Sequence, residues 1–260
     1  EWEFSDSAEA VEHLSPFCTF LSKTLGKTIA PLYLKKATEL ETYLKKPDVL
    51  FGIINTGVVL KKYNTFHLEP LLLTVKNGKK QHRKRFIVPI RGKFNSIEEL
   101  KGKRLTILSS DRYTLQKQIS LIRSGEIASP SLFFSSILET ASPKSAILSV
   151  MFGLADSALT TPESLKSAQK ENPRLNDHIR ILHYLHPMTY SPFVSIGKRI
   201  DPQQAESLQN ALSSLHQTES GKRLMSIIDA DAFEKTDLED FTNRNLAFYQ
   251  KEEFAGQEVS

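Results

Sequence analysis

Apolar residues occur along the chain either in short continuous runs or three to four positions apart. The runs Val49–Ile54 and Phe86–Ile90 are short and almost wholly apolar, which predicts strands buried on both faces. The predicted strands are Ile29–Leu34, Val49–Ile54, Phe66–Val75, Phe86–Ile90, Leu105–Leu108, Ser131–Phe134, Ala155–Thr160, Ile179–Leu185 and Pro192–Ile196. Because amphipathic helical segments alternate with these strands, we expect an α/β fold with mixed, mostly parallel sheets flanked by helices.

Helix boundaries are indicated by capping residues. Ser142-Pro143 places a capping hydroxyl before a proline at the first helical position, and Gly153 follows the end of that apolar series. Ser5 or Asp6 can cap the first helix, which Gly26 closes. The other predicted helices are Ala37–Leu44, a helix after Asn55, Leu115–Arg123, a helix from Thr161, and the tail helices Pro202–Leu215, Gly221–Ile228 and Leu238–Tyr249.

The order of these elements predicts two lobes. The chain leaves the first α/β unit near residues 86–90, builds a second one and returns near residues 188–192 through a linker with two prolines. We therefore expect one lobe from residues 1–87 and 191–260 and another from residues 88–190. Two crossovers make a hinge, and the cleft between the lobes is the natural ligand site.

Composition narrows the class of protein. The 260 residues are 40% hydrophobic and 25% charged, which is ordinary for a globular protein, and the net charge is +4. Much of the basic excess lies in Lys79–Arg85, after a turn at Asn77-Gly78. No aromatic residues interleave with these charges, so a solvated hairpin is favoured over a nucleic-acid site. Cys18 is the only cysteine, which excludes an internal disulfide and predicts a small buried core residue.

The chain shows no targeting or membrane segment. Its longest uncharged apolar run, Ala146–Ala155, is about half the ~20 residues that a membrane span needs. No signal peptide is visible, so we expect a processed chain from which upstream residues have been removed. No direct membrane insertion and no cofactor are predicted.

Three segments together resemble a known family. They are LKGKR with the following strand and polar loop within Ser96–Thr114, AILSVMFGLADSAL at Ala146–Leu159, and VLFGIINTG at Val49–Gly57. In this order they resemble the periplasmic solute-binding proteins of phosphonate, phosphite and phosphate ABC transporters. The resemblance implies the two-lobed type II periplasmic-binding fold. It also implies capture of a small anionic ligand outside the cytoplasm, in the periplasm, for an ABC transporter permease.

The loop after the LKGKR strand is the first predicted binding segment. A helix that starts there directs unpaired N–H groups beyond the strand tips, where anions bind. The resemblance places a Ser-Thr-Ser phosphonate-binding run at Arg112, Tyr113 and Thr114, of which only Thr114 keeps a similar hydroxyl. Arg112 could grip an oxyanion in bidentate fashion, pair with Asp111 or point to solvent.

The resemblance implies further ligand contacts in other segments. Pro143 replaces a family histidine, with Ser142 and Lys144 beside it, and Lys144 is either a replacement cation or a surface lysine. Asp156 matches an aspartate that faces the ligand, although a hydrogen-bonded residue at the lobe edge would also explain it. The remaining candidates are His82, which replaces a tyrosine, the helix-start residues Asn55 and Thr56, which capping alone would explain, and Ser7 in the first loop.

These substitutions predict a solute-binding protein with altered ligand choice and no tight binding of simple phosphonates. A degenerate binding domain, or the ligand-sensing domain of a signalling system, fits the same residues. Catalysis is not expected, since the chain has no Gly-x-Ser-x-Gly, His-Glu-x-x-His or phosphate-loop motif. His183 and His186 would face opposite sides of a strand, which makes them a poor metal pair.

Overall fold

The computed structural model describes residues 7–34, 37–122 and 129–245, and these form two compact units. The central unit contains His82–Met188, and the terminal unit contains residues 7–81 with Thr189–Arg244. The chain passes between the units inside two short strands, β3 (Gln81–His82) and β9 (Met188–Thr189), which pair with each other. Sequence analysis placed the lobe boundaries at 87/88 and 190/191, and which residues act as hinges stays a prediction.

The central unit is built on a five-stranded sheet with the order β6-β5-β7-β4-β8. β5 pairs in parallel with β6 and β7, whereas β4 pairs antiparallel with β7 and β8, so the sheet is mixed. Its elements are β4 (Arg85–Pro89), η1 (Glu98–Leu100), β5 (Arg104–Leu108), η2 (Ser109–Asp111), α4 (Arg112–Ile122), α5 (Pro130–Phe133), β6 (Ser136–Thr140), α6 (Pro143–Met151), β7 (Ser157–Thr160), α7 (Pro162–Glu171), α8 (Leu175–His178) and β8 (Ile179–Tyr184).

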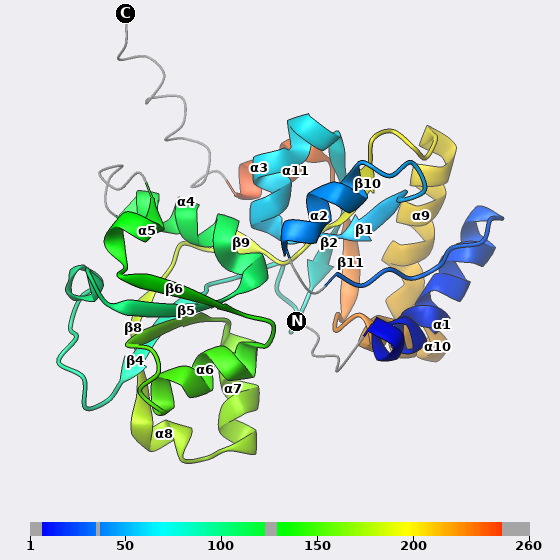
Figure 1. Cartoon of the computed structure of the whole chain (residues 1–260). Helices are drawn as coiled ribbons and strands as arrows, with labels where there is room; N and C mark the ends of the chain where they lie inside the picture. The colour runs from blue at the N-terminus through cyan, green and yellow to red at the C-terminus, as the bar shows by residue number, and fades with distance from the viewer. Residues whose placement is uncertain (1–6, 35–36, 123–128, 246–260) are drawn as a thin grey trace, which may run out of the picture. The chain divides into compact units, whose positions relative to one another are not determined.

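Helices cover both faces of this sheet, with α4 and α5 on one side and α6 and α7 on the other (Figure 1). The alternation along β4 explains the two layers. Phe86 and Val88 pack in the cluster that includes Leu115 and Ile119 of α4, whereas Ile87 packs with α6 and α7. Successive side chains of a strand point to opposite faces, so a run of apolar residues fills both cores.

The terminal unit contains a four-stranded sheet with the order β1-β10-β2-β11. All of its pairings are antiparallel, which corrects the expectation of a mostly parallel sheet for the described part of this unit. Its elements are α1 (Ser7–Leu25), α2 (Ala37–Leu44), β1 (Phe51–Ile53), α3 (Thr56–Phe66), β2 (Leu68–Val75), β10 (Phe193–Ile196), α9 (Pro202–Ser214), η3 (Leu215–Gln217), α10 (Glu219–Ile227), β11 (Ala232–Lys235) and α11 (Leu238–Arg244).

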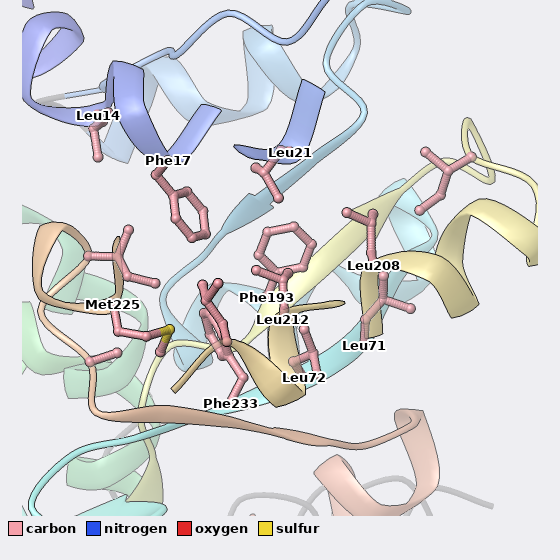
Figure 2. Close-up of a cluster of buried hydrophobic side chains, with 14 residues drawn as sticks. Leu14, Phe17, Leu21, Leu71, Leu72, Phe193, Leu208, Leu212, Met225 and Phe233 are labelled. Atoms are coloured by element: carbon pink, nitrogen blue, oxygen red, sulfur yellow. The ribbon is translucent and has the colours of Figure 1, made fainter. Parts of the chain in front are cut away.

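One apolar cluster joins α1, α9 and α10 to the sheet of the terminal unit (Figure 2). Phe193 of β10 stacks on Phe51 of β1 at 5.2 Å between ring centroids and meets the edge of Phe233 of β11 at 6.2 Å. Leu14, Phe17 and Leu21 of α1 close the cluster from the helix side. Each such fully buried side chain stabilises the fold by about 1.5–3 kcal/mol relative to exposure.

Most predicted elements are confirmed, with three local corrections. Residues 28–34 form no strand, and β11 follows α10 where sequence analysis expected only helices. Ser131–Phe134 was predicted as a strand, but Pro130–Phe133 is a helical turn and the strand begins at Ser136. The Ser129 hydroxyl caps this turn and Pro130 occupies its first position, a helix-start combination that was overlooked. The predicted cap residues Ser5 and Asp6 lie outside the described residues.

The turn before the basic run forms as predicted. Asn77 and Gly78 both have positive φ, at 51° and 67°, and Lys76 and Lys79 exchange two backbone hydrogen bonds of 2.9 Å around them. Cys18 is half-buried on α1, and burial raises the pKa of its thiol. Of the helices in the described residues, none has the length and apolar character that a membrane crossing requires.

Candidate functional site

The carboxyl ends of β5, β6 and β7 meet at one edge of the central sheet. Each is followed by a polar loop that starts a helix: η2 and α4 after β5, α6 after β6, and α7 after β7. Because β4 runs antiparallel to β7, with Arg85 opposite Thr160, its first residues lie at the same edge. This carboxyl edge therefore collects helix N-termini, which attract anions, and the side chains that flank them.

Lys84 and Asp111 form a buried ion pair at the carboxyl edge. Lys84 directly precedes β4, and Asp111 directly precedes α4. Each side chain is only 2% exposed, and the Lys84 ammonium donates to Oδ1 of Asp111. In the sheet β7 lies between β4 and β5, so this pair spans the carboxyl end of β7. The pair fixes the start of α4 relative to β4.

Arg112 pairs with Glu139 rather than with Asp111. Its Nε lies 2.9 Å from Oε1 of Glu139 on β6, and the arginine side chain is 64% exposed. The pair is therefore accessible to solvent, unlike the Lys84–Asp111 pair. Tyr113 is half-buried, whereas Thr114 is fully buried, so a ligand cannot reach the Thr114 hydroxyl without a rearrangement.

A hydroxyl network joins the loops after β5 and β6. Ser109 Oγ donates to the Thr140 carbonyl at 3.4 Å, and Thr140 Oγ1 donates to the Ser142 carbonyl at 3.0 Å. Ser142 caps α6 by accepting from the Ser145 amide at 3.3 Å, as the sequence predicted. The structure thus brings Ser142 and the Arg112–Thr114 segment to one edge of the sheet.

Lys144 does not join this group of side chains. It forms an ion pair with Glu171, which connects α6 to α7, and both side chains are about half exposed. This position agrees with the prediction of a surface lysine rather than with that of a cation that replaces the family histidine.

Asp156 lies at the opposite end of the strands. Its carboxylate accepts the Arg104 amide at 2.8 Å and the Arg104 Nε and Nη2 at 3.1 and 3.0 Å. Arg104 begins β5 and Leu108 ends it, so about 13 Å of strand separates Asp156 from the loop before Arg112. The structure does not bring Asp156 together with Arg112–Thr114. The hydrogen bonds from Arg104 hold the pKa of Asp156 below its usual value.

The terminal unit carries the candidates around Asn55. Asn55 caps α3, with Oδ1 accepting from the Gly57 amide at 2.9 Å. Thr56 is buried, and its hydroxyl donates to the carbonyls of Thr189 and Tyr190 at 2.9 and 3.1 Å. These contacts give both residues structural roles.

The other two predicted residues have less defined surroundings. Ser7 is the first residue of α1, and His82 is half-buried in β3, where the chain enters the central unit. Across the described parts of the chain, no group of three or more His, Cys, Asp or Glu side chains is placed to hold a metal ion.

Sequence reasoning did not assign Lys84, Asp111, Thr160 or Thr161 to the binding site, although it named Asp111 as a possible partner of Arg112 and Thr161 as a helix start. Thr160 ends β7, and Thr161 caps α7 by accepting from the Ser164 amide at 3.1 Å. The alternation of side chains along a strand could have predicted that Lys84 is buried. Positions 84, 86 and 88 share one face, and Phe86 and Val88 are fully buried there. The surrounding basic residues concealed this, because a run of charges is normally a solvated segment.

Comparison with known proteins identifies related sequences and folds. Residues 4–241 match the family model described as periplasmic substrate-binding protein of the phosphonate ABC transporter. A search of curated proteins found no match.

Three solved structures have a similar fold. A Xanthomonas citri protein bound to chloride has 18% identity over 94% of each chain, with a TM-score of 0.78. The same protein bound to ATP has 17% identity over 96% of each chain and a TM-score of 0.75. A Prochlorococcus marinus protein in complex with methylphosphonate has 16% identity over 93% of each chain and a TM-score of 0.72. At these identities the likeness establishes the fold.

Proposed function

This chain belongs to the family of periplasmic substrate-binding proteins of phosphonate ABC transporters, and from that premise we propose where it binds its solute. Membership makes it a solute-binding protein for an ABC importer and implies a location outside the cytoplasm and a permease as partner. We propose that the solute is a small anion, and that its charged group meets the carboxyl edge of the central unit at Arg112.

The observation that carries this proposal is the exposed pair between Arg112 and Glu139. A solvent-exposed ion pair stabilises a fold by only about 0–1 kcal/mol, so an incoming anion can replace Glu139 at little cost. Arginine then offers two parallel N–H donors, which match a carboxylate or phosphate-like group. Lys144, also paired at the surface, lacks this planar donor geometry.

Neighbouring groups support an anion at Arg112. Ser109, Ser110 and Tyr113 are half-buried around the start of α4, so each of these residues is partly accessible to solvent at the carboxyl edge. α4 has 11 residues, and its N-terminus adds backbone N–H groups and a partial positive charge. Ser142 at the start of α6 provides a second helix N-terminus in the adjacent loop.

The ligands of structurally similar proteins agree with an anionic solute. Chloride, ATP and methylphosphonate are all anions. The chain nevertheless has arginine, tyrosine and proline at 112, 113 and 143, where the family resemblance expects hydroxyls and a histidine. We therefore propose altered ligand choice, with weak binding of simple phosphonates.

Ser7, Asn55 and His82 stay predictions that rest on the family resemblance alone. Thr56 is not proposed as a ligand contact, because it is buried and its hydroxyl donates to the carbonyls of Thr189 and Tyr190. Asp156 is not included, because it is held by Arg104 at the other end of the strands. Each of these assignments is tested by single substitution once the solute is known.

Identification of a co-purified solute by native mass spectrometry is the first test, followed by calorimetry on variants. Arg112→Ala should weaken binding of that solute by about 10- to 100-fold, since a hydrogen bond to a charged group contributes roughly 1.5–3 kcal/mol. Lys144→Ala is the matched control, since it removes an equally charged, surface-paired cation from the same unit. Equal affinity of Arg112→Ala and wild type would refute the assignment of Arg112.

A further inference from the structure

A surface groove lies beside α7, on the face of the central sheet that α6 and α7 cover. Its volume is about 420 Å³, and small-molecule sites have roughly 300–1,000 Å³. Isoleucines of β4 and β8 form its floor: Ile87, Ile179 and Ile181. Ile87 and Ile179 are buried and belong to the apolar cluster that packs with α6 and α7. The groove therefore offers an apolar surface beside β8, the edge strand of this sheet.

One side of α7 forms the wall of this groove. Pro162, Leu165, Lys166 and Gln169 line it, and residues spaced by three or four positions share one side of a helix. Leu165 is buried, Lys166 is exposed and Gln169 is half-buried. The wall thus carries a cation and an amide next to the apolar floor.

Arg85 supplies a second cation to the groove. It is half-buried at the start of β4, and its guanidinium carbon lies 5.2 Å from the centre of the Tyr184 ring on β8. Its Nε atom is buried and has no hydrogen-bond partner within the described residues. Buried donors are almost always paired in folded proteins, so this arginine is not committed to an acceptor of the fold. Because the side chain remains partly accessible, its N–H groups can turn to an acceptor in the groove.

Arg180 also borders the groove, but its charged group is used elsewhere. It lies opposite Val88, whose side chain packs in the cluster on the α4 side of the sheet. Residues directly opposite each other share one face of a sheet, and the Arg180 Nη2 donates to the Phe94 carbonyl. The described lining contains no acidic side chain, which leaves Arg85 and Lys166 as the two cations that face this groove.

We propose that this groove is a second ligand site, which binds a small organic anion with an apolar body, such as a medium-chain carboxylate. The carboxylate accepts N–H groups of Arg85, and Lys166 adds a second positive charge at the wall. The apolar body lies on the isoleucine floor. This site goes beyond the proposed solute site at Arg112, because α4 and α7 lie on opposite faces of the sheet (Figure 1).

The length of the groove selects the class of anion. Arg85 begins β4, and Ile179 lies opposite Pro89 at the other end of that strand. Four residues of strand span about 13 Å. An inorganic anion would contact the cations only, whereas a chain of several methylene groups also covers the isoleucines.

The test uses octanoate as the probe, with acetate and 1-octanol as partial probes. Calorimetry should show a single saturable octanoate site, with at least about tenfold weaker binding of acetate, which lacks the apolar body, and of octanol, which lacks the charge. NMR of isotope-labelled isoleucine methyl groups should show shifts of Ile87, Ile179 and Ile181 during the titration. Unsaturable octanoate binding, or shifts confined to other isoleucines, would overturn the proposal.

Substitution of the two cations tests their roles. Arg85→Met removes the charge but keeps an unbranched side chain, and it should weaken octanoate binding by about tenfold or more. Lys166→Met should weaken it by only about threefold, because this lysine is exposed. Lys170→Met is the matched control, since it removes an exposed lysine of α7 that does not line the groove. Equal octanoate affinity of Arg85→Met and wild type, or an equal loss in Lys170→Met, would refute the site.

Gln169→Glu tests the same site in a protein that keeps Arg85, and it replaces Arg85→Met if that variant is unfolded. It puts a carboxylate of nearly the same shape into the wall, so octanoate should bind more weakly and octanol equally well. Equal weakening of both probes would show that charge does not select the ligand. Tighter binding of a polyglutamate peptide than of octanoate, with shifts of the same isoleucines, would assign the groove to an acidic protein segment and overturn the small-molecule assignment.

Discussion

Lys84 and Asp111 form an ion pair across the carboxyl end of β7, with both side chains almost completely shielded from water. Desolvation makes such a pair a poor source of net stability, yet each partner depends strongly on the other. Single and paired substitutions should therefore behave very differently.

Lys84→Met should destabilise the protein by about 3–5 kcal/mol, because it leaves the buried Asp111 carboxylate without its charge partner. The double variant Lys84→Met with Asp111→Leu should recover much of this loss, since two apolar side chains need no charge partner. Urea denaturation of the three variants and wild type gives the free energies of unfolding. If the double variant is as unstable as the sum of both single variants, the two side chains are not coupled as described.

Thr56→Val should destabilise the terminal unit by about 1–3 kcal/mol. Valine keeps the branched shape but removes the hydroxyl that donates to the carbonyls of Thr189 and Tyr190. Thr19→Val is the control, because the Thr19 hydroxyl donates only to the Ser15 carbonyl within α1, and its loss should cost less than ~0.5 kcal/mol. Equal effects in thermal unfolding would contradict the importance of the Thr56 contacts.

Gly221→Ala should prevent the normal packing of α10 against η3. A Cβ atom at this position would lie 1.7 Å from the Leu215 carbonyl oxygen, so the backbone has to move. Overpacked core sites typically lose about 1–3 kcal/mol, and we expect a loss at the upper end of that range because the clash is with backbone atoms. Gly102→Ala meets no atom within 4 Å and should cost only the strain of its positive φ of 73°, about 1–2 kcal/mol. Similar unfolding midpoints for the two variants would show that α10 adapts.

Continuous apolar runs were sufficient to locate the buried strands of the central unit. Phe86–Ile90 was recognised because a strand that fills two cores has little polar alternation. In the terminal unit, Val49–Ile54 also predicted a strand, but Phe51–Ile53 is a half-buried edge strand and not one buried on both faces. Ser131–Phe134 misled for the same reason, since two phenylalanines produce an apolar run inside a single helical turn. Parallel and antiparallel pairing in the terminal unit depends on contacts between distant segments, which one sequence does not reveal.

Of the candidate site, the sequence predicted only the roles of residues at helix starts. Capping by Asn55 and Ser142 followed directly from residue type and position. The ion-pair partners of three other residues could not be predicted in this way, because each partner lies on or beside another strand. The pairs are Arg112–Glu139, Asp111–Lys84 and Asp156–Arg104. An acidic residue in an apolar strand has many possible partners in sequence, and only the sheet order selects one.

Asp156→Asn tests whether the solute binds at the carboxyl edge of the central sheet or at the opposite end of its strands, where Asp156 lies. Arg104 lowers the pKa of Asp156 in the folded state, so the ionised carboxylate stabilises the fold above the unfolded pKa of about 3.9. The advantage of wild type over Asp156→Asn at neutral pH should be small, because the pair is partly exposed, and it should shrink as pH falls below about 4. Unfolding by urea between neutral and acidic pH measures the difference.

Solute affinity at neutral pH should be unchanged in this variant, because about 13 Å of strand lies between Asp156 and the Arg112 loop. A large change in affinity or in preferred solute, with the fold intact, would place the solute near Asp156 and refute its binding at the carboxyl edge.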